Sequence, residues 1–179
     1  MTMDVPIKYR NASLKNATLL PPKIVEIGER WVEKEAPKSL LLTGLPGSGK
    51  TYFAYSLYND LFSTRNIFVT ARNLDKELLN ASRECPGEEE FLLEKYLACP
   101  VLFIDDLGLE RATERMLGIW YDIFESRGSN RLVTVITSNF NRSQILSNIG
   151  DRIGSRLNEF YNITFPNKDL RKEIGDRSW

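Results

Sequence analysis

The chain has 179 residues, enough for one domain that buries roughly two-thirds of the surface of its unfolded chain. Lys and Arg together number 24, as do Asp and Glu, so the formal net charge of zero excludes a globally basic nucleic-acid binder and leaves room only for a local basic patch. Histidine is absent and Cys85 and Cys99 lack the spacing of metal ligands, which excludes zinc sites, Ser-His-Asp triads and imidazole general bases.

Membrane and secretory signals are lacking. No apolar segment approaches the length that spans a bilayer, and the N-terminus has no signal-peptide hydrophobic region. We therefore expect a cytoplasmic protein with no membrane partner. Both cysteines are expected to be reduced, as in cytosolic enzymes.

The first part of the chain predicts a lead-in and a helix. Residues 1–20 are polar and irregular, and we expect them to form a lead-in segment to a core over residues 21–179. Pro21-Pro22 suits the start of a helix, and apolar residues at helical spacing extend it to about Glu35. Pro37 is expected to stop that helix.

Strand and helix patterns alternate over the rest of the chain. Strands are expected at 39–43, 66–70, 101–104, 132–137 and 162–165, and helices at 50–62, 73–82, 88–97, 113–126, 142–147 and 149–159. Gly128-Ser129-Asn130 is expected to form a turn. Nearly apolar strands between amphipathic helices are typical of an α/β fold with a parallel sheet covered on both faces. Such five-stranded sheets bind ligands beyond the carboxyl ends of their strands.

Residues 44–51 read Gly-Leu-Pro-Gly-Ser-Gly-Lys-Thr, a complete G-x-x-x-x-G-K-[ST] phosphate-binding loop between a predicted strand and a predicted helix. This context favours nucleotide binding over a merely structural glycine-rich turn. Backbone N–H groups and the positive end of the helix dipole can surround a polyphosphate there. Lys50 is expected to reach the β- and γ-phosphates and the Thr51 hydroxyl to bind Mg²⁺. The predicted nucleotide-binding residues of the loop are Gly44, Pro46, Gly47, Ser48, Gly49, Lys50, Thr51 and Tyr52.

The strand at 101–104 ends in Asp105-Asp106, the form of a Walker B motif. Asp105, at the strand tip, can hold the Mg²⁺ ion through water, and Asp106 can polarise an attacking water. The usual second residue in this class of ATPases is Glu, and Asp is one methylene shorter. The alternative interpretation is a pair of turn-forming aspartates after a strand.

The strand at 132–137 ends in Thr137-Ser138-Asn139. If it lies beside the 101–104 strand, Asn139 projects toward the γ-phosphate and can orient the lytic water; alternatively, it only caps the following turn. About 55 residues separate Lys50 from Asp105, which leaves room for an extra strand between the two motif strands. This spacing fits the additional-strand P-loop ATPases better than nucleotide kinases or GTPases.

With these motifs in place, the chain resembles the AAA+ ATPases of the DnaC/DnaI helicase-loader and IstB transposition-helper group over nearly its whole length. The matching segments are 5–14, 41–51, 104–108 with Glu110 and Thr113, 136–139 and 150–157. The resemblance explains Asp106, because the group often carries Asp there. It implies ATP and Mg²⁺ as ligands, slow hydrolysis that depends on an oligomer or DNA, and a reduced or absent C-terminal lid, since fewer than ten residues follow Arg171.

Three arginines take roles only through this resemblance. Arg156 aligns with the arginine that completes the site of a neighbouring subunit in a homo-oligomer, and Arg152 is the second candidate. Arginines at this i, i+4 spacing, taken alone, indicate a solvated helix face. Arg171 aligns with the sensor-2 arginine, which contacts the nucleotide in cis.

The resemblance also implies partners, namely a replicative helicase and single-stranded DNA, or, as the alternative, a DNA transposase. A small-molecule kinase is a further alternative, which would need an acceptor pocket in place of the trans-acting arginine. DNA contact has faint support from basic residues, which could equally form a solvated face. Those residues are Arg65, Arg72, Lys76, Arg83, Arg111, Arg115, Arg127 and Arg131.

Overall fold

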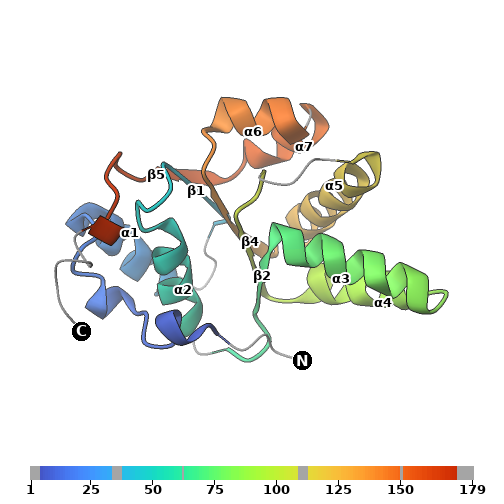
Figure 1. Ribbon diagram of the computed structural model, residues 1–179, viewed down its shortest axis with the longest axis horizontal. Coiled ribbons are helices and arrows are strands. Elements are labelled where there is room, and N and C mark those ends of the chain that lie inside the picture. The colour runs from blue at the N-terminus through green and yellow to red at the C-terminus, as the bar shows by residue number, and fades with distance from the viewer. Residues whose placement is uncertain (1–4, 34–37, 62, 109–112, 150, 173–179) are drawn as a thin grey trace.

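A computed structural model describes residues 5–33, 38–61, 63–108, 113–149 and 151–172 (Figure 1). Five parallel strands form one sheet in the order β2–β3–β4–β1–β5. Their bounds are β1 Leu40–Thr43, β2 Ile67–Thr70, β3 Val101–Asp105, β4 Val133–Ser138 and β5 Tyr161–Thr164. The predicted α/β fold with a five-stranded parallel sheet is confirmed.

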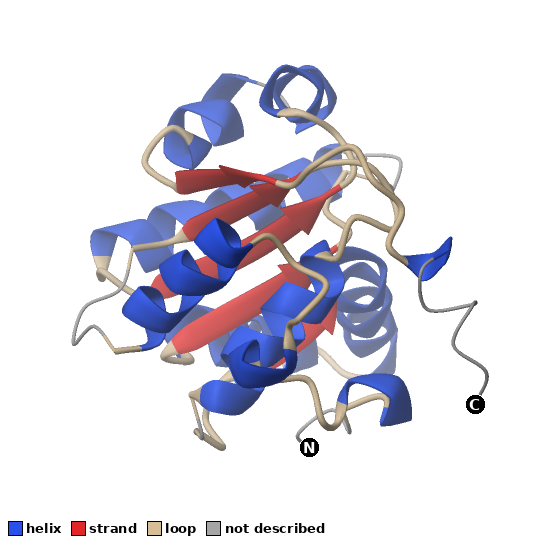
Figure 2. Cartoon of the chain, turned by 90° about the vertical axis from the view of Figure 1, so that its left-hand side faces the viewer, coloured by secondary structure: helices blue, strands red, loops and turns tan. Residues whose placement is uncertain are grey.

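Helices cover both faces of this sheet. They are α1 Pro22–Val32, α2 Lys50–Asp60, α3 Ala71–Glu84, α4 Glu88–Ala98, α5 Glu114–Ser129, α6 Arg142–Ile149 and α7 Asp151–Leu157, with short 3-10 turns at Ile7–Tyr9 and Leu14–Asn16. Figure 1 shows α1 and α2 on one side of the sheet and α3, α4 and α5 on the other, and Figure 2 shows the strands side by side between these layers. Within the described ranges, no helix is both long enough and apolar enough to cross a membrane.

Alternate residues of each inner strand enter two separate apolar layers. Leu41 and Ile104 pack into the layer of α3, α4, α5, α6 and α7, whereas Leu40, Leu42 and Phe103 pack into the layer of α1, α2 and the lead-in segment. Successive side chains of a strand point to opposite faces, so a strand with helices on both faces must be apolar throughout. This is the physical reason for the unbroken apolar runs in the sequence.

The central position of β4 arranges the site. β4 pairs with β1 on one side and with β3 on the other, in registers that bring Ser138 opposite Thr43 and Ile136 opposite Ile104. The expected extra strand between the two motif strands is therefore present, and it is β4, which follows both in the chain. β2, which intervenes in sequence, lies at the sheet edge beyond β3.

Several helix boundaries differ from the prediction by a few residues, and two of them have a clear local reason. α3 starts at Ala71, earlier than predicted, because the Thr70 hydroxyl caps it by accepting the Asn73 N–H at 3.1 Å. α5 extends through Ser129, so of the residues predicted to turn, 128–130, only Asn130 lies outside the helix. The chain reverses instead at Asn130 and Arg131, where Arg131 takes a φ of 54°. α1 ends at Val32, and the predicted stop at Pro37 lies outside the described residues.

The lead-in segment packs against α2, the helix that follows the phosphate-binding loop. The Asn59 side chain donates hydrogen bonds to the carbonyl oxygens of Tyr9 and Ala12 at 3.0 and 2.8 Å. The Tyr9 ring stacks on the Tyr55 ring with 4.4 Å between centroids. The lead-in segment is therefore fixed on the core by hydrogen bonds to its backbone carbonyls and by a stacked aromatic pair.

Candidate nucleotide-binding site

The segment between β1 and α2 forms a tight loop at the carboxyl edge of the sheet. Gly47 and Gly49 take φ values of 82° and 98°, in the left-handed region that residues with a Cβ rarely adopt. A Cβ at Gly49 would also lie 2.5 Å from Leu20 Cδ2. Backbone conformation and close packing therefore both require glycine at this position.

Lys50 opens α2 and occupies the centre of the loop, with only 4% of its surface exposed. Its ammonium donates to the carbonyl oxygens of Gly44 and Leu45, both at 2.8 Å, and to Asn139 Oδ1 at 3.0 Å. Burial lowers the pKa of Lys50, while the charges of Asp106 and Asp105 act to raise it. The predicted phosphate-binding cation thus has acceptors from two strand ends around it.

The two predicted metal-binding residues are adjacent. The Thr51 hydroxyl donates to Asp105 Oδ1 at 2.9 Å, and the Thr137 hydroxyl donates to the same oxygen at 2.6 Å. Burial raises the pKa of Asp105, and the hydrogen bonds from Thr137 and Thr51 oppose that rise. A hydroxyl beside a carboxylate is a hard-oxygen donor set that fits Mg²⁺. Thr51 and Asp105 are the residues that would hold the ion.

Asp106 and Asn139 also come together. Asp106 takes a φ of 59°, and its N–H donates to Thr137 Oγ1 at 3.0 Å. Its carboxylate accepts a hydrogen bond from Asn139 Nδ2 at 3.4 Å. Thr137 therefore orients both aspartates, a role that sequence reasoning missed. The available signal was a hydroxyl at the carboxyl end of an otherwise apolar strand.

The C-terminal segment reaches the loop as well. Leu170 donates its N–H to Gly47 O at 2.9 Å. This bond places the next residue, Arg171, beside the loop, and the charge of Arg171 adds to the larger effect of burial in lowering the pKa of Lys50. Tyr52 is half-buried in the first turn of α2 and packs against the apolar layer of α1 and the lead-in segment.

Arg156 lies at the opposite edge of the sheet, where the strands begin. It lines a cavity of about 310 Å³ together with Ser39, Val133 and Arg131. Its guanidinium pairs with Glu125 of α5 and with Glu159, the latter at 3.3 Å. The fold does not bring Arg156 to Lys50 of the same chain. Arg152 lies in α7, and its side chain is outside the described part of the structure, as are Gly150 and Glu110.

Comparison with known proteins places this site in a family. The family described as IstB-like ATP binding protein matches residues 12–154, which include both the phosphate-binding loop and the two aspartates. The chain belongs to this family. It is therefore an IstB-like ATP-binding protein, and it has the fold of P-loop AAA+ proteins such as DnaC.

Two curated proteins are similar to parts of this IstB-like chain. It is 30% identical over 176 residues to the proteasome-activating nucleotidase of Methanothermobacter thermautotrophicus, which covers 90% of this chain and 41% of that protein. It is 24% identical over 121 residues to the replicative helicase loader DnaC of Escherichia coli, covering 66% of this chain and 49% of DnaC. The chain thus spans half or less of the length of these two relatives.

A solved structure of DnaI is similar over nearly all of both chains. The TM-score is 0.76 at 27% sequence identity, with 92% of this IstB-like chain and 96% of that chain covered. The similarity therefore extends beyond the phosphate-binding loop to the whole arrangement of sheet and helices.

The basic residues predicted to contact DNA separate into three groups. Arg127 is only 1% exposed, and its guanidinium donates to carbonyl oxygens of Tyr96 and Cys99, both at 2.8 Å, so its predicted DNA contact is wrong. Arg115 is paired with Asp75 and Glu89. The exposed ones are Arg65, Arg72, Lys76, Arg83 and Arg131, and Arg111 lies outside the described residues.

Proposed function

We propose that this chain is the ATPase module of a DNA replication helicase loader that assembles with nucleotide and contacts single-stranded DNA and a replicative helicase. The observation that carries the proposal is the joint placement of Lys50, Asn139 and Asp106, in which one amide links a phosphate-binding cation to a carboxylate. The DnaI and DnaC similarities support the loader assignment.

Each residue of the site has a role in this proposal. The loop and Lys50 would bind the triphosphate of ATP, and Thr51 with Asp105 would hold Mg²⁺, which would neutralise phosphate charge. Asp106 and Asn139 hold the attacking water and orient it toward the γ-phosphate. Their mutual hydrogen bond fixes the two side chains before substrate arrives.

We propose that the chain forms a homo-oligomer, because Arg156 lies too far from the nucleotide site of its own chain to contact the phosphates there. An arginine at the edge where the strands begin can meet a nucleotide at the edge where another subunit's strands end. A guanidinium supplied in this way is worth roughly 10³–10⁵ in turnover in phosphoryl-transfer enzymes. Arg152, one helical turn earlier, is the second candidate. In such an oligomer the Arg156 guanidinium would contact the phosphates of ATP bound to the neighbouring subunit while it stays paired with Glu125 and Glu159.

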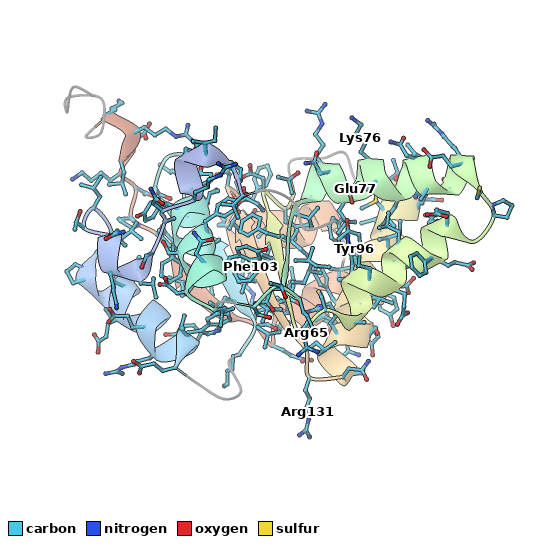
Figure 3. All side chains as sticks on the ribbon, turned by 90° about the horizontal axis from the view of Figure 1, so that it is seen from below. Arg65, Lys76, Glu77, Tyr96, Phe103 and Arg131 are labelled. Atoms are coloured by element: carbon cyan, nitrogen blue, oxygen red, sulfur yellow. The ribbon has the colours of Figure 1, made fainter. Side chains whose placement is uncertain are left out.

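DNA contact is proposed along α3. Arg72, Lys76 and Arg83 are exposed and lie on one face of this helix, since their spacings of four and seven residues are close to whole helical turns. Figure 3 shows Lys76 pointing outward from α3. A row of cations along a helix can follow a phosphate backbone. α3 is held by its partner helix, because the Tyr96 hydroxyl of α4 donates to Glu77 at 2.6 Å.

The alternative function, favoured by the family match, is an IstB-like ATPase helper of a DNA transposase. One experiment separates the two. ATP turnover and molar mass are measured with and without single-stranded DNA, then with a replicative helicase or a transposase from the same genome. Nucleotide-dependent binding to the helicase, with stimulated turnover, supports the loader. Binding to the transposase alone supports the helper, and turnover that transfers phosphate to a metabolite contradicts both.

A further inference from the structure

The segment 169–171 lies directly on the phosphate-binding loop. Besides its backbone bond to Gly47, Leu170 covers Gly49, where a Cβ would lie 3.2 Å from Leu170 Cδ1. The Leu170 side chain is only 7% exposed, so this contact is part of the core. The loop is therefore held from outside by a piece of chain that follows the last strand.

Asp169 also lies against the loop, at Gly47. A Cβ built at Gly47 would lie 2.0 Å from Asp169 Oδ1, so the carboxylate occupies the space where a side chain at Gly47 would begin. The same oxygen accepts the backbone N–H of Arg171 at 3.0 Å. One carboxylate oxygen thus touches the loop and fixes the start of the turn that carries Arg171.

Arg171 follows Leu170, whose N–H donates to Gly47 O, and Lys50 lies three residues after Gly47, so segments in direct contact carry the two cations. Repulsion between like charges is unfavourable unless an anion lies between them, in which case both cations stabilise it. The position of Arg171 should therefore affect how tightly a polyphosphate binds at the loop. Whatever fixes the 169–171 turn controls that position.

Building on the ATP site proposed above, we propose that Asp169 is a positioning residue that docks the 169–171 turn on the phosphate-binding loop and so holds Arg171 toward the terminal phosphates of ATP. The feature that acts is the hydrogen-bond acceptor at Oδ1. The negative charge acts in the opposite direction, because a carboxylate close to phosphates repels them. This distinguishes Asp169 from Asp105, whose charge is needed for the metal.

The test uses the full chain with a labelled ATP analogue and steady-state turnover. Loss of one hydrogen bond predicts that Asp169→Ala raises the Kd for ATP roughly five- to tenfold, with KM rising by a similar factor and kcat changing less. Asp169→Asn keeps the acceptor and should bind within about twofold of wild type. Arg171→Ala should weaken binding at least as much. The double Asp169→Ala/Arg171→Ala variant should be no weaker than Arg171→Ala, since both act through one group.

Asp122→Ala, which removes an exposed aspartate from α5, is the matched control and should leave the Kd unchanged. Tighter ATP binding by Asp169→Ala would show that the carboxylate only competes with phosphates and would overturn the inference. So would additive losses in the double variant. Asp169→Asn preserves the volume of the side chain, so it remains a usable test if Asp169→Ala does not fold. A rise in its Kd for ATP of more than about fivefold would contradict the inference. Wild-type protein that fails to bind ATP refutes the proposed function itself, whereas equal binding by wild type and Asp169→Ala refutes this inference alone.

Discussion

Lys50 Nζ donates a hydrogen bond to Asn139 Oδ1 across 3.0 Å, although 89 positions separate the two residues in the chain. This contact exists because β4 lies between β1 and β3, so that the residue after β4 faces the start of α2. Asn139 is thereby in reach of Asp106 as well. An amide that can donate with Nδ2 and accept with Oδ1 suits a place between a cation and a carboxylate.

Replacing Asn139 should therefore affect chemistry more than binding. We expect Asn139→Ala to change the Kd for ATP less than about fivefold, because Lys50 keeps its other acceptors, and to lower kcat roughly 10- to 100-fold through loss of water orientation. Separate binding and turnover measurements distinguish the two effects. Asn130→Ala, in the exposed turn before β4, is the control. An unchanged kcat would show that Asn139 only caps the turn that follows it.

Lys50→Ala should abolish ATP binding in the micromolar range. The substitution removes a buried ammonium whose charge-assisted hydrogen bonds to phosphate are each worth about 1.5–3 kcal/mol. Titration with a labelled ATP analogue measures the loss, and Lys23→Ala, on the exposed side of α1, is the matched control. Equal affinity of Lys50→Ala and wild type would refute the nucleotide site.

Arg156→Ala should leave ATP binding nearly intact and lower turnover by roughly 10³-fold if it acts on a neighbouring subunit. Mixing it with Asp106→Asn, which has a defective site and an intact Arg156, should restore part of the hydrolysis. Turnover is measured over a range of mixing ratios, with oligomer formation verified by molar mass. Arg142→Ala, on α6, is the control. Absence of rescue at every ratio contradicts action in trans.

Arg127 should matter for stability and not for DNA. Arg127→Ala leaves buried carbonyl oxygens of Tyr96 and Cys99 without donors and opens a cavity, so we expect it to lower the free energy of unfolding by about 3 kcal/mol. Arg131→Ala is the control, because Arg131 points away from the molecule in Figure 3, and its effect should stay within about 0.5 kcal/mol. Denaturant unfolding measures both. Equal stability of the two variants would contradict the structural role.

The α3 residues should govern the salt dependence of DNA binding. Each of Arg72→Ala, Lys76→Ala and Arg83→Ala should weaken single-stranded DNA binding and reduce the slope of log K against log salt by about 0.7. Fluorescence anisotropy over a salt series measures this slope. Lys95→Ala, on the neighbouring helix α4, is the matched control. A slope unchanged in the triple variant would remove α3 as the DNA-contacting helix.

Local patterns in the sequence determined the fold class, the phosphate-binding loop and the paired aspartates. These features depend on short-range requirements. A strand covered on both faces must be apolar, and a loop that binds phosphate needs glycines with a following lysine and hydroxyl at fixed spacing. Local sequence patterns alone therefore predict Lys50, Thr51, Asp105, Asp106 and Asn139 as residues of the site.

Only the tertiary structure decided which distant residues share this site. Thr137 orients both aspartates because β4 lies beside β3 in the sheet. Asp169 reaches Gly47 because the chain after β5 passes over the phosphate-binding loop. No local sequence pattern encodes either arrangement. The same holds for the arginines. Arg127 and Arg131 are close in sequence, yet the helix end buries one beneath backbone carbonyls and exposes the other. Charge and periodicity are properties of the sequence, whereas burial depends on how the elements pack.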